Sequence, residues 1–228
     1  MSSFFSISGQ LDYNEVLLIQ RRLNELVNSG KLSGAILILE HNEVYTCGIH
    51  KDMANISPEH DIIMVERGGG ITYHCPGQIV IYFFVDMKEL HLNARLLIEL
   101  IHASIIQMLN EMGIEARSML GNETGIWVMD RKICSTGLAI KGNSTLHGTA
   151  LNYSNALDGF RLINPCGFDP AVMTSCRKES RNEILPIEAA KAILGEKLCR
   201  ALNIDFQNKK SWEETKNFVN GQLSEIAP

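Results

Sequence analysis

The sequence lacks the features of a membrane or secreted protein. No apolar run reaches about 18 residues without a charged side chain, the length that a membrane-spanning helix requires. The first residues, MSSFFSISGQLDY, have neither the basic start nor the longer apolar stretch of a secretion signal. Clustered positive charge is also missing, since the formal net charge is −5 and the sequence pI is about 5.8. We therefore expect a cytoplasmic protein that binds no membrane and no nucleic acid.

Closely paired cysteines are absent as well. The six cysteines, at positions 47, 75, 134, 166, 176 and 199, show neither the spacing of a zinc site nor the density of a disulfide scaffold. In a reducing compartment they are free thiols. The sequence therefore predicts no metal site.

Internal repeats, low-complexity tracts and linkers are missing too. A chain of 228 residues that is 45% hydrophobic is long enough for one sizeable core. We expect a single domain over residues 1–228.

Apolar residues at helical spacing predict four helices. The first lies between Asp12 and Gly30, and Asp12 with Glu15 resembles a capping box. The second ends at Gly113 and carries one apolar stripe: Leu97, Ile101, Ile105, Met108 and Met112. Residues 187–202 and 211–219 are the other two helical segments.

Short apolar runs bounded by turn residues predict strands. Four of them, at residues 34–40, 43–48, 61–66 and 78–85, are expected in one sheet. Three more, at residues 125–129, 132–140 and 145–154, are typical of a hairpin or meander. Consecutive strands outnumber strand–helix alternations, so we expect an α/β domain of the α+β type. Its sheet should be mostly mixed or antiparallel and covered by helices.

The segment RGGGITYHCPGQ, residues 67–78, is the strongest candidate for a ligand loop. Its glycines let the backbone come close to a ligand, although a tight turn alone would also explain them. It is neither a Walker loop nor a dinucleotide fingerprint, because no Gly-Lys-Ser/Thr ending and no following helix are present. Arg67 and His74 near its ends favour a binding role.

A reactive thiol is the second candidate feature. Cys166 lies between Pro165 and Gly167, a placement that exposes a side chain on a sharp turn. A free thiol is only a few per cent ionised at neutral pH, so a nucleophile needs a cation or a base nearby, and Lys132 or His147 are candidates. Cys176 competes with Cys166 because it precedes Arg177 and Lys178.

Five motifs together resemble the lipoyl(octanoyl) transferase family of the biotin/lipoate protein ligase superfamily. The family patterns are an HPPVYTLG-like stretch, RGGxxTxHGPGQ, KIaaiG, HGlALN and PCG. This chain has HNEVYTCG, RGGGITYHCPGQ, KICSTG, HGTALN and NPCG in the same order, between about His41 and Cys176. The combination is far more specific than any one motif. The resemblance implies a biotin/lipoate protein ligase-like fold.

The resemblance assigns roles residue by residue. The nucleophile falls on Cys166, the lysine that lowers its pKa on Lys132, and the histidine of the HG motif on His147. Acyl-substrate contacts fall on these residues: Arg67, Gly68, Gly69, Gly70, Ile71, Thr72, Tyr73, His74, Ser135, Thr136, Gly137, Gly148, Thr149 and Ala150. Tyr45 and Tyr82 match pocket-side tyrosines of the family less closely.

The implied reaction is a double displacement without a cofactor. Cys166 takes octanoyl from acyl carrier protein and passes it to a lysine of a lipoyl domain, as in 2-oxoacid dehydrogenases and the glycine cleavage H protein. This would be the first step of lipoate biosynthesis. Backbone N–H groups near Gly137 or Gly167 are candidates for the oxyanion site. Leu138, Ile71 and Ala150 are candidates for the apolar wall around an eight-carbon chain.

Three departures from the family patterns affect the loop and the pocket lining. Cys75 replaces a glycine, Asn42 and Glu43 replace two prolines, and Thr149 replaces a common leucine. None of them changes the Cys166–Lys132 pair.

Three other functions remain open. Lipoate-protein ligases of the same superfamily activate free lipoate with ATP, and amidotransferases move octanoyl between lipoyl domains. A domain that only binds carrier or lipoyl domains is the third alternative.

Overall fold

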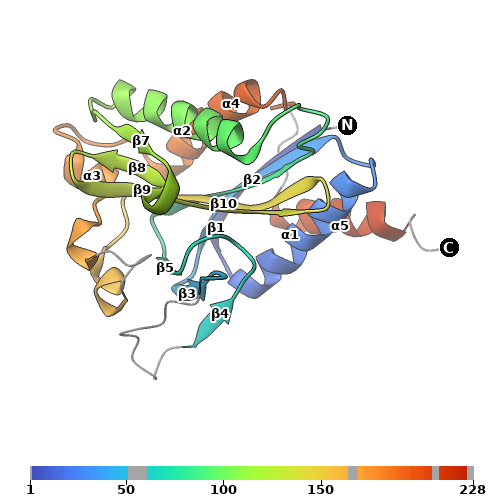
Figure 1. Ribbon diagram of the computed structural model, residues 1–228, viewed down its shortest axis with the longest axis horizontal. Helices are drawn as coiled ribbons and strands as arrows, with labels where there is room; N and C mark the ends of the chain where they lie inside the picture. The colour runs from blue at the N-terminus through green and yellow to red at the C-terminus, as the bar shows by residue number, and fades with distance from the viewer. Residues whose placement is uncertain (1, 51–60, 164–168, 207–210, 225–228) are drawn as a thin grey trace.

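Two sheets and the helices around them form the structure (Figure 1), a computed structural model that describes residues 2–50, 61–163, 169–206 and 211–224. The strands are β1 (Ser2–Leu11), β2 (Gly34–His41), β3 (Val44–Cys47), β4 (Ile62–Met64), β5 (Ile71–His74), β6 (Gln78–Val85), β7 (Arg117–Met119), β8 (Gly125–Val128), β9 (Arg131–Lys141) and β10 (Ser144–Asn152). The helices are α1 (Tyr13–Asn28), α2 (Ala94–Glu111), α3 (Cys176–Glu179), α4 (Ile187–Ala201) and α5 (Trp212–Ser224).

The larger sheet has seven strands in the order β1-β2-β6-β10-β9-β8-β7. Strands β1 and β2 are parallel, and every other neighbouring pair is antiparallel. Strands β8 to β10 follow one another as the predicted meander, and β7, which was not predicted, extends it by one strand. The mixed, mostly antiparallel sheet confirms the predicted fold class.

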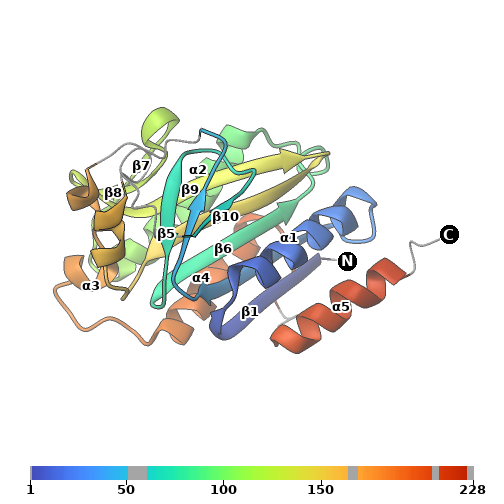
Figure 2. The ribbon, with the colours of Figure 1, turned by 90° about the horizontal axis from the view of Figure 1, so that it is seen from below.

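Helices cover both faces of this sheet. Helices α2 and α4 pack on one face, and α1 and α5 on the other (Figures 1 and 2). The adjacent residues Phe4 and Phe5 of β1 show the division, because successive side chains of a strand point to opposite faces. Phe4 belongs to the core under α4, and Phe5 to the core under α1 and α5.

The prediction of one sheet is wrong for two of the runs. Strands β3 and β4 form a separate three-stranded sheet with β5, in the order β4-β3-β5. The reason lies in β2, which pairs with β1 along one edge and with β6 along the other. No backbone edge of β2 is left for β3, so the chain begins a second sheet. This small sheet lies beside α1 (Figure 2).

Helix boundaries follow the capping residues. The Asp12 side chain accepts hydrogen bonds from the backbone N–H groups of Asn14 at 2.9 Å and Glu15 at 3.1 Å, which confirms the predicted start of α1. Gly30 follows the helix with a φ of +74°. Within the described ranges, no helix combines the length and the apolar character needed to cross a lipid bilayer.

Candidate active site

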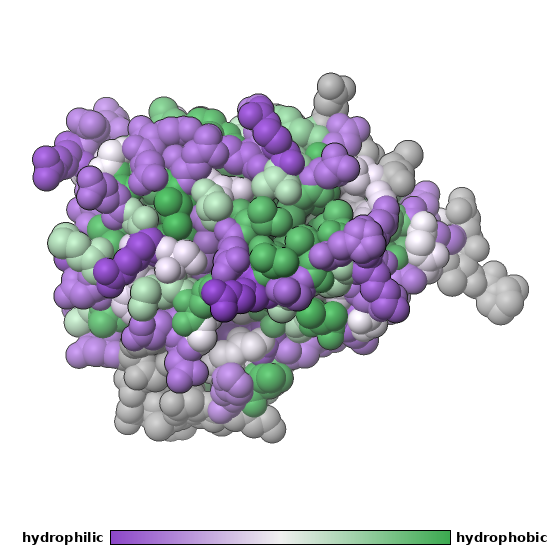
Figure 3. Space-filling view, turned by 45° about the horizontal axis from the view of Figure 1, so that its top comes forward, coloured by the Kyte–Doolittle hydropathy of each residue, from purple (hydrophilic) through white to green (hydrophobic). Residues whose placement is uncertain are grey.

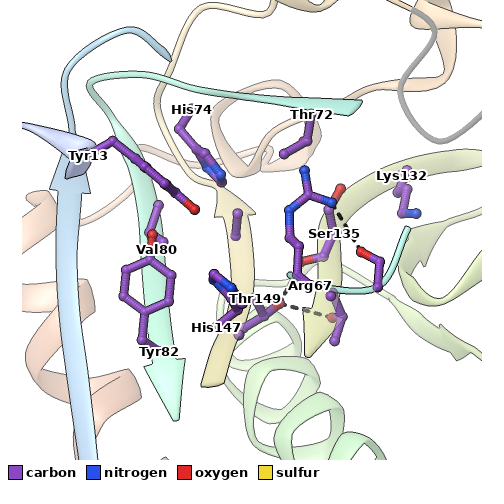
Figure 4. Close-up of a pocket in the computed structure, with 15 residues that line it drawn as sticks. Tyr13, Arg67, Thr72, His74, Val80, Tyr82, Lys132, Ser135, His147 and Thr149 are labelled. Carbon is purple, nitrogen blue, oxygen red and sulfur yellow. Dashed lines mark hydrogen bonds between the residues drawn. The ribbon is translucent and has the colours of Figure 1, made fainter. Parts of the chain in front are cut away.

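A pocket lies between the two sheets, where the glycine-rich segment meets β6, β9 and β10 (Figure 4). Twelve residues singled out from the sequence line it: Arg67, Gly68, Thr72, His74, Lys132, Ser135, Thr136, Gly137, His147, Gly148, Thr149 and Ala150. They come from three sequence motifs. The fold therefore brings together segments that are up to about eighty residues apart.

The glycine-rich loop is held against β9 by backbone contacts. The N–H of Gly68 donates to the carbonyl of Leu138 at 3.1 Å. A Cβ on Gly137 would lie 2.9 Å from the Gly68 carbonyl oxygen, closer than a normal contact. Glycine at position 137 thus permits the loop to approach the strand.

Arg67 organises the loop from within. Its Nη1 donates to the carbonyls of Gly68 at 3.1 Å and Gly70 at 2.8 Å, and its Nη2 donates to the Thr46 carbonyl at 2.8 Å. The Nε atom is buried and has no hydrogen-bond partner among the described residues. This cationic side chain therefore shapes the loop and ties it to β3.

Lys132 lies on the pocket wall, and its side chain is only 4% exposed. Its Nζ is 5.5 Å from the centre of the Trp127 ring, within cation–π range. A Cβ on Gly125 of β8 would lie 2.5 Å from Lys132 Cε, so that glycine makes room for the lysine. The sequence left two directions open for this amine, toward solvent or into a pocket, and the structure selects the pocket.

His74 faces the same pocket from β5. Its Nδ1 lies 2.7 Å from Gln78 Oε1. Burial lowers the pKa of His74 to about 3, so the imidazole is neutral at pH 7. Figure 4 shows His74 and Tyr13 on one side of Arg67 and Lys132 on the other.

His147 combines an unusual backbone with unpartnered ring nitrogens. Its φ of +63° lies in the left-handed region, which is uncommon outside glycine and frequent at functional sites. Neither ring nitrogen has a hydrogen-bond partner within the described part of the chain, and Nε2 is 3.6 Å from Glu66 Oε2. Burial lowers the pKa of His147 to about 4, so this contact is not an ion pair at neutral pH.

Two threonines continue the wall as a hydrogen-bonded pair. Thr136 of β9 and Thr149 of β10 are register partners, and their hydroxyl oxygens are 3.0 Å apart. Thr149 donates to the Ser135 carbonyl at 2.8 Å, and Thr136 Oγ1 is 2.9 Å from Nε2 of the buried His102 on α2. The hydroxyls are therefore satisfied inside the protein, which lowers the cost of facing an apolar ligand.

The pocket also includes Tyr82, which matched a pocket-side tyrosine of the family, and two residues that the sequence did not single out, Tyr13 and Val80. The Tyr13 ring stacks on His74 at 5.8 Å, and the Tyr82 hydroxyl lies 2.7 Å from His41 Nε2. Val80 and Tyr82 had a detectable signal, because alternation along β6 places them on one face. Tyr13 follows a helix cap, and nothing in its local sequence indicates a pocket.

Some predicted contact residues lie elsewhere. Because side chains alternate along a strand, Ile71 and Tyr73 point away from the pocket that Thr72 and His74 line. Both pack in a separate core cluster with Tyr45, which is thus not at the pocket either. The structure does not place Ile71 on the apolar wall.

Gly69 and Gly70 line an outer groove that also includes Leu138. The groove and the inner pocket share Gly68, Lys132, Thr136 and Gly137. The inner cavity has a volume of about 50 Å³ and the groove about 600 Å³. Exposed apolar side chains near the groove include Ile140, and Figure 3 shows apolar residues gathered on the face where α2 comes forward. Because Lys132 lines both spaces, it lies where the cavity opens into the groove.

Cys166 and Gly167 lie outside the described residues. The chain on either side is described: Ile163 and Met173, three residues before and seven residues after Cys166, belong to one core cluster. Met173 forms a bridge with Lys132, and the N–H of Thr174 donates to the Lys132 carbonyl at 3.0 Å. Met173 and Thr174, seven and eight residues after Cys166, therefore lie beside the backbone of Lys132.

The five described cysteines are all buried. Burial raises the pKa of Cys75 to about 11, of Cys134 to about 12 and of Cys199 to about 12. It also raises the pKa of Cys176, despite the neighbouring basic residues. These environments oppose thiolate formation. Among the residues that the structure describes, no three His, Cys, Asp or Glu side chains lie close enough to hold a metal ion.

Comparison with known proteins gives consistent matches. The family model described as lipoyl protein ligase A/B catalytic domain matches residues 12–198. A probable octanoyltransferase 2 from Picrophilus torridus is 44% identical over 180 residues, which are 79% of this chain and 71% of the relative. An octanoyltransferase from a Thermoanaerobacter species is 34% identical over 206 residues, 87% of this chain and 89% of the relative.

Solved structures give the same fold at low identity. A crystal structure of lipoate-protein ligase A bound with ATP superposes with a TM-score of 0.73 at 14% identity, covering 99% of this chain and 95% of that one. This likeness concerns the fold.

Proposed function

Because the chain belongs to the lipoyl protein ligase A/B catalytic-domain family, we propose that it is an octanoyltransferase of lipoate biosynthesis. It acts as one catalytic domain, takes octanoyl from acyl carrier protein, and transfers it to a lysine of a lipoyl domain. Cys166 is the nucleophile and Lys132 holds its thiol in the ionised form.

One observation carries this proposal. The buried Lys132 amine lies at the junction of the inner cavity and the outer groove, and Met173 and Thr174, seven and eight residues after Cys166, contact the backbone of the same lysine. A cation close to a thiol stabilises the thiolate and lowers its pKa. The deep burial of Cys176 supports the choice of Cys166 over its competitor.

The chemistry is two acyl transfers. The Cys166 thiolate attacks the thioester carbonyl of the octanoyl carrier, and the carrier thiolate leaves. The amine of the acceptor lysine then attacks the new thioester, loses a proton, and expels the Cys166 thiolate. Exchange between thioesters is nearly balanced in energy and amide formation runs downhill, so the reaction needs no ATP. Positioning and oxyanion stabilisation, for which N–H groups near Gly137 or Gly167 are candidates, are the protein's contribution.

The acyl chain needs both the inner cavity and the outer groove. A cavity of about 50 Å³ holds little more than water-sized groups, whereas the groove adds about 600 Å³ beside it. Burial of an alkyl chain contributes about 0.8 kcal/mol per methylene, so the walls around this space set much of the affinity. We propose that Thr136, Thr149 and Ala150 contact the chain, with Arg67 and the loop 68–74 enclosing it.

Intact-mass measurement after mixing with octanoyl carrier protein tests this function. We expect the mass of one octanoyl group on the protein, located on the Cys166 peptide, and its loss when a lipoyl domain is added. Cys166→Ala should show no added mass, and Cys176→Ser is the matched control that keeps it. Activity of Cys166→Ala with ATP and free octanoate would instead identify a ligase. A wild-type protein that gains no octanoyl mass and is inactive with ATP and free octanoate would leave only a binding role.

A further inference from the structure

A chain of hydrogen bonds links His74 to the strand that carries Lys132. His74 Nδ1 lies 2.7 Å from Gln78 Oε1, Gln78 Nε2 donates to Asn152 Oδ1 at 2.9 Å, and Asn152 Nδ2 donates to the Thr174 carbonyl at 3.0 Å. The Thr174 N–H in turn donates to the Lys132 carbonyl. Gln78 and Asn152 are both buried and neither lines the pocket.

The backbone carbonyls of Thr174 and Tyr73 fix the direction of the side-chain hydrogen bonds in this network. A carbonyl oxygen only accepts, so the Asn152 group that faces Thr174 is the amide nitrogen, and Asn152 Oδ1 must face Gln78. The Gln78 nitrogen then donates to Asn152 and also to the carbonyl of Tyr73, at 3.3 Å. Asn155 Nδ2, 3.3 Å from Asn152 Oδ1, agrees with this orientation. Gln78 can therefore offer only its oxygen to His74.

We propose that Gln78 and Asn152 are positioning residues that fix His74 in the tautomer with a proton on Nδ1 and an unprotonated Nε2. An acceptor oxygen 2.7 Å from Nδ1 requires a proton on that nitrogen. A neutral ring then has only a lone pair on Nε2. On the side of the pocket remote from Lys132, His74 is therefore uncharged, and its one N–H is already bonded to Gln78.

An uncharged His74 suits an alkyl chain, and to that extent the inference rests on the proposed function. An imidazolium would oppose the burial of methylene groups, whereas a neutral ring has no charge to desolvate. The groups around the ring favour neutrality. Arg67 is a cation, His41 and His147 are neutral because burial lowers the pKa of each to about 4, and Tyr13 stacks on the ring as a neutral phenol.

Nitrogen-15 NMR of the histidine side chains tests the assignment in the wild-type protein. At neutral pH we expect the His74 signals of a neutral ring that is protonated at Nδ1 and unprotonated at Nε2, assigned by comparison with His74→Gln. A ring protonated at Nε2, or at both nitrogens, would overturn the inference. This readout needs no acyl substrate, so it is separate from any failure of the proposed function.

Gln78→Glu adds a functional readout. A carboxylate beside Nδ1 should raise the pKa of His74, so that the ring in the pocket becomes charged at a higher pH than in the wild-type protein. We expect the KM for octanoyl carrier protein to rise roughly tenfold or more as the pH falls through the new pKa, since a buried charge opposes the alkyl chain. Gln107→Glu, the same change at an exposed position of α2, should leave the KM unchanged. A His74 ring that titrates at the same pH in Gln78→Glu as in the wild-type protein would contradict the positioning role.

Discussion

The buried ion pair of Lys191 offers a stability prediction that can be worked out from distances. Lys191 of α4 is fully buried, and its Nζ donates to Glu40 Oε1 at 2.8 Å and to Glu188 Oε1 at 2.8 Å. Glu40 is also buried, and its other oxygen accepts from the N–H of Gly77 at 2.7 Å. The pair therefore connects a C-terminal helix to the turn that precedes Gln78.

Lys191→Met should destabilise the fold strongly. Methionine keeps the length and the helix propensity of lysine, so the change removes mainly the charge. Glu40 then becomes a buried carboxylate without its cation, and breaking a buried pair in this way costs about 3–5 kcal/mol. The double variant Lys191→Met, Glu40→Gln removes the uncompensated charge and should recover a large part of that loss.

Urea denaturation of Lys191→Met and of the double variant measures how much free energy of unfolding each loses, and Lys197→Met is the matched control. Lys197, also on α4, pairs with Glu111 at 2.7 Å, but the Glu111 side chain is 52% exposed. Lys197→Met should cost at most about 1 kcal/mol, as for other solvent-exposed pairs. Equal losses in Lys191→Met and Lys197→Met would refute the reasoning, as would a double variant less stable than Lys191→Met alone.

Three further predictions concern the site and the core. Cys176→Ser should keep octanoyl transfer within a few-fold of wild type, because this thiol is buried away from the pocket; a turnover assay that shows inactivation of a folded variant would reinstate it as nucleophile. Thr149→Val removes the hydroxyl that joins Thr136 and the Ser135 carbonyl, so we expect about 1–3 kcal/mol of lost stability in thermal melts with octanoyl transfer retained. Finally, stability should fall between pH 6.5 and 5, because burial lowers the pKa values of His41, His102 and His147 to about 4 and that of His74 to about 3. The unfolded chain binds protons in this range and the folded chain does not, so each buried histidine lowers the free energy of unfolding by about 2 kcal/mol at pH 5. Urea denaturation curves that are the same at pH 7 and pH 5 would contradict the burial of these neutral rings.

Much of the pocket was predictable because the motifs carry its residues in local runs. The segments that contain Arg67, Lys132 and His147 each provide several lining residues, and the pairing of β9 and β10 as a hairpin brings the last two together. The capping residue Asp12 likewise determined where α1 begins. These features depend on residues close together in the chain.

The remaining features depend on distant partners. Strand β1 was not predicted, although it has ten residues, and it is held in the sheet by parallel pairing with β2. The second sheet follows from which edges of β2 are already occupied, and local propensity contains no information about that. Tyr13 reaches the pocket only through the packing of α1 beside the small sheet. Ile71 and Tyr73 were assigned to the pocket because the motif was treated as one continuous run, although side chains along a strand point alternately to two faces.

The pH dependence of alkylation at Cys166 tests the proposed lysine-assisted thiolate most directly. The rate is measured by peptide mapping with iodoacetamide, in the wild-type protein and in Lys132→Met. We expect the wild-type thiol to titrate well below the ordinary value of about 8.5, and the thiol of Lys132→Met to titrate at a clearly higher pH. A Cys166 that titrates near 8.5 in both proteins would contradict the role of Lys132.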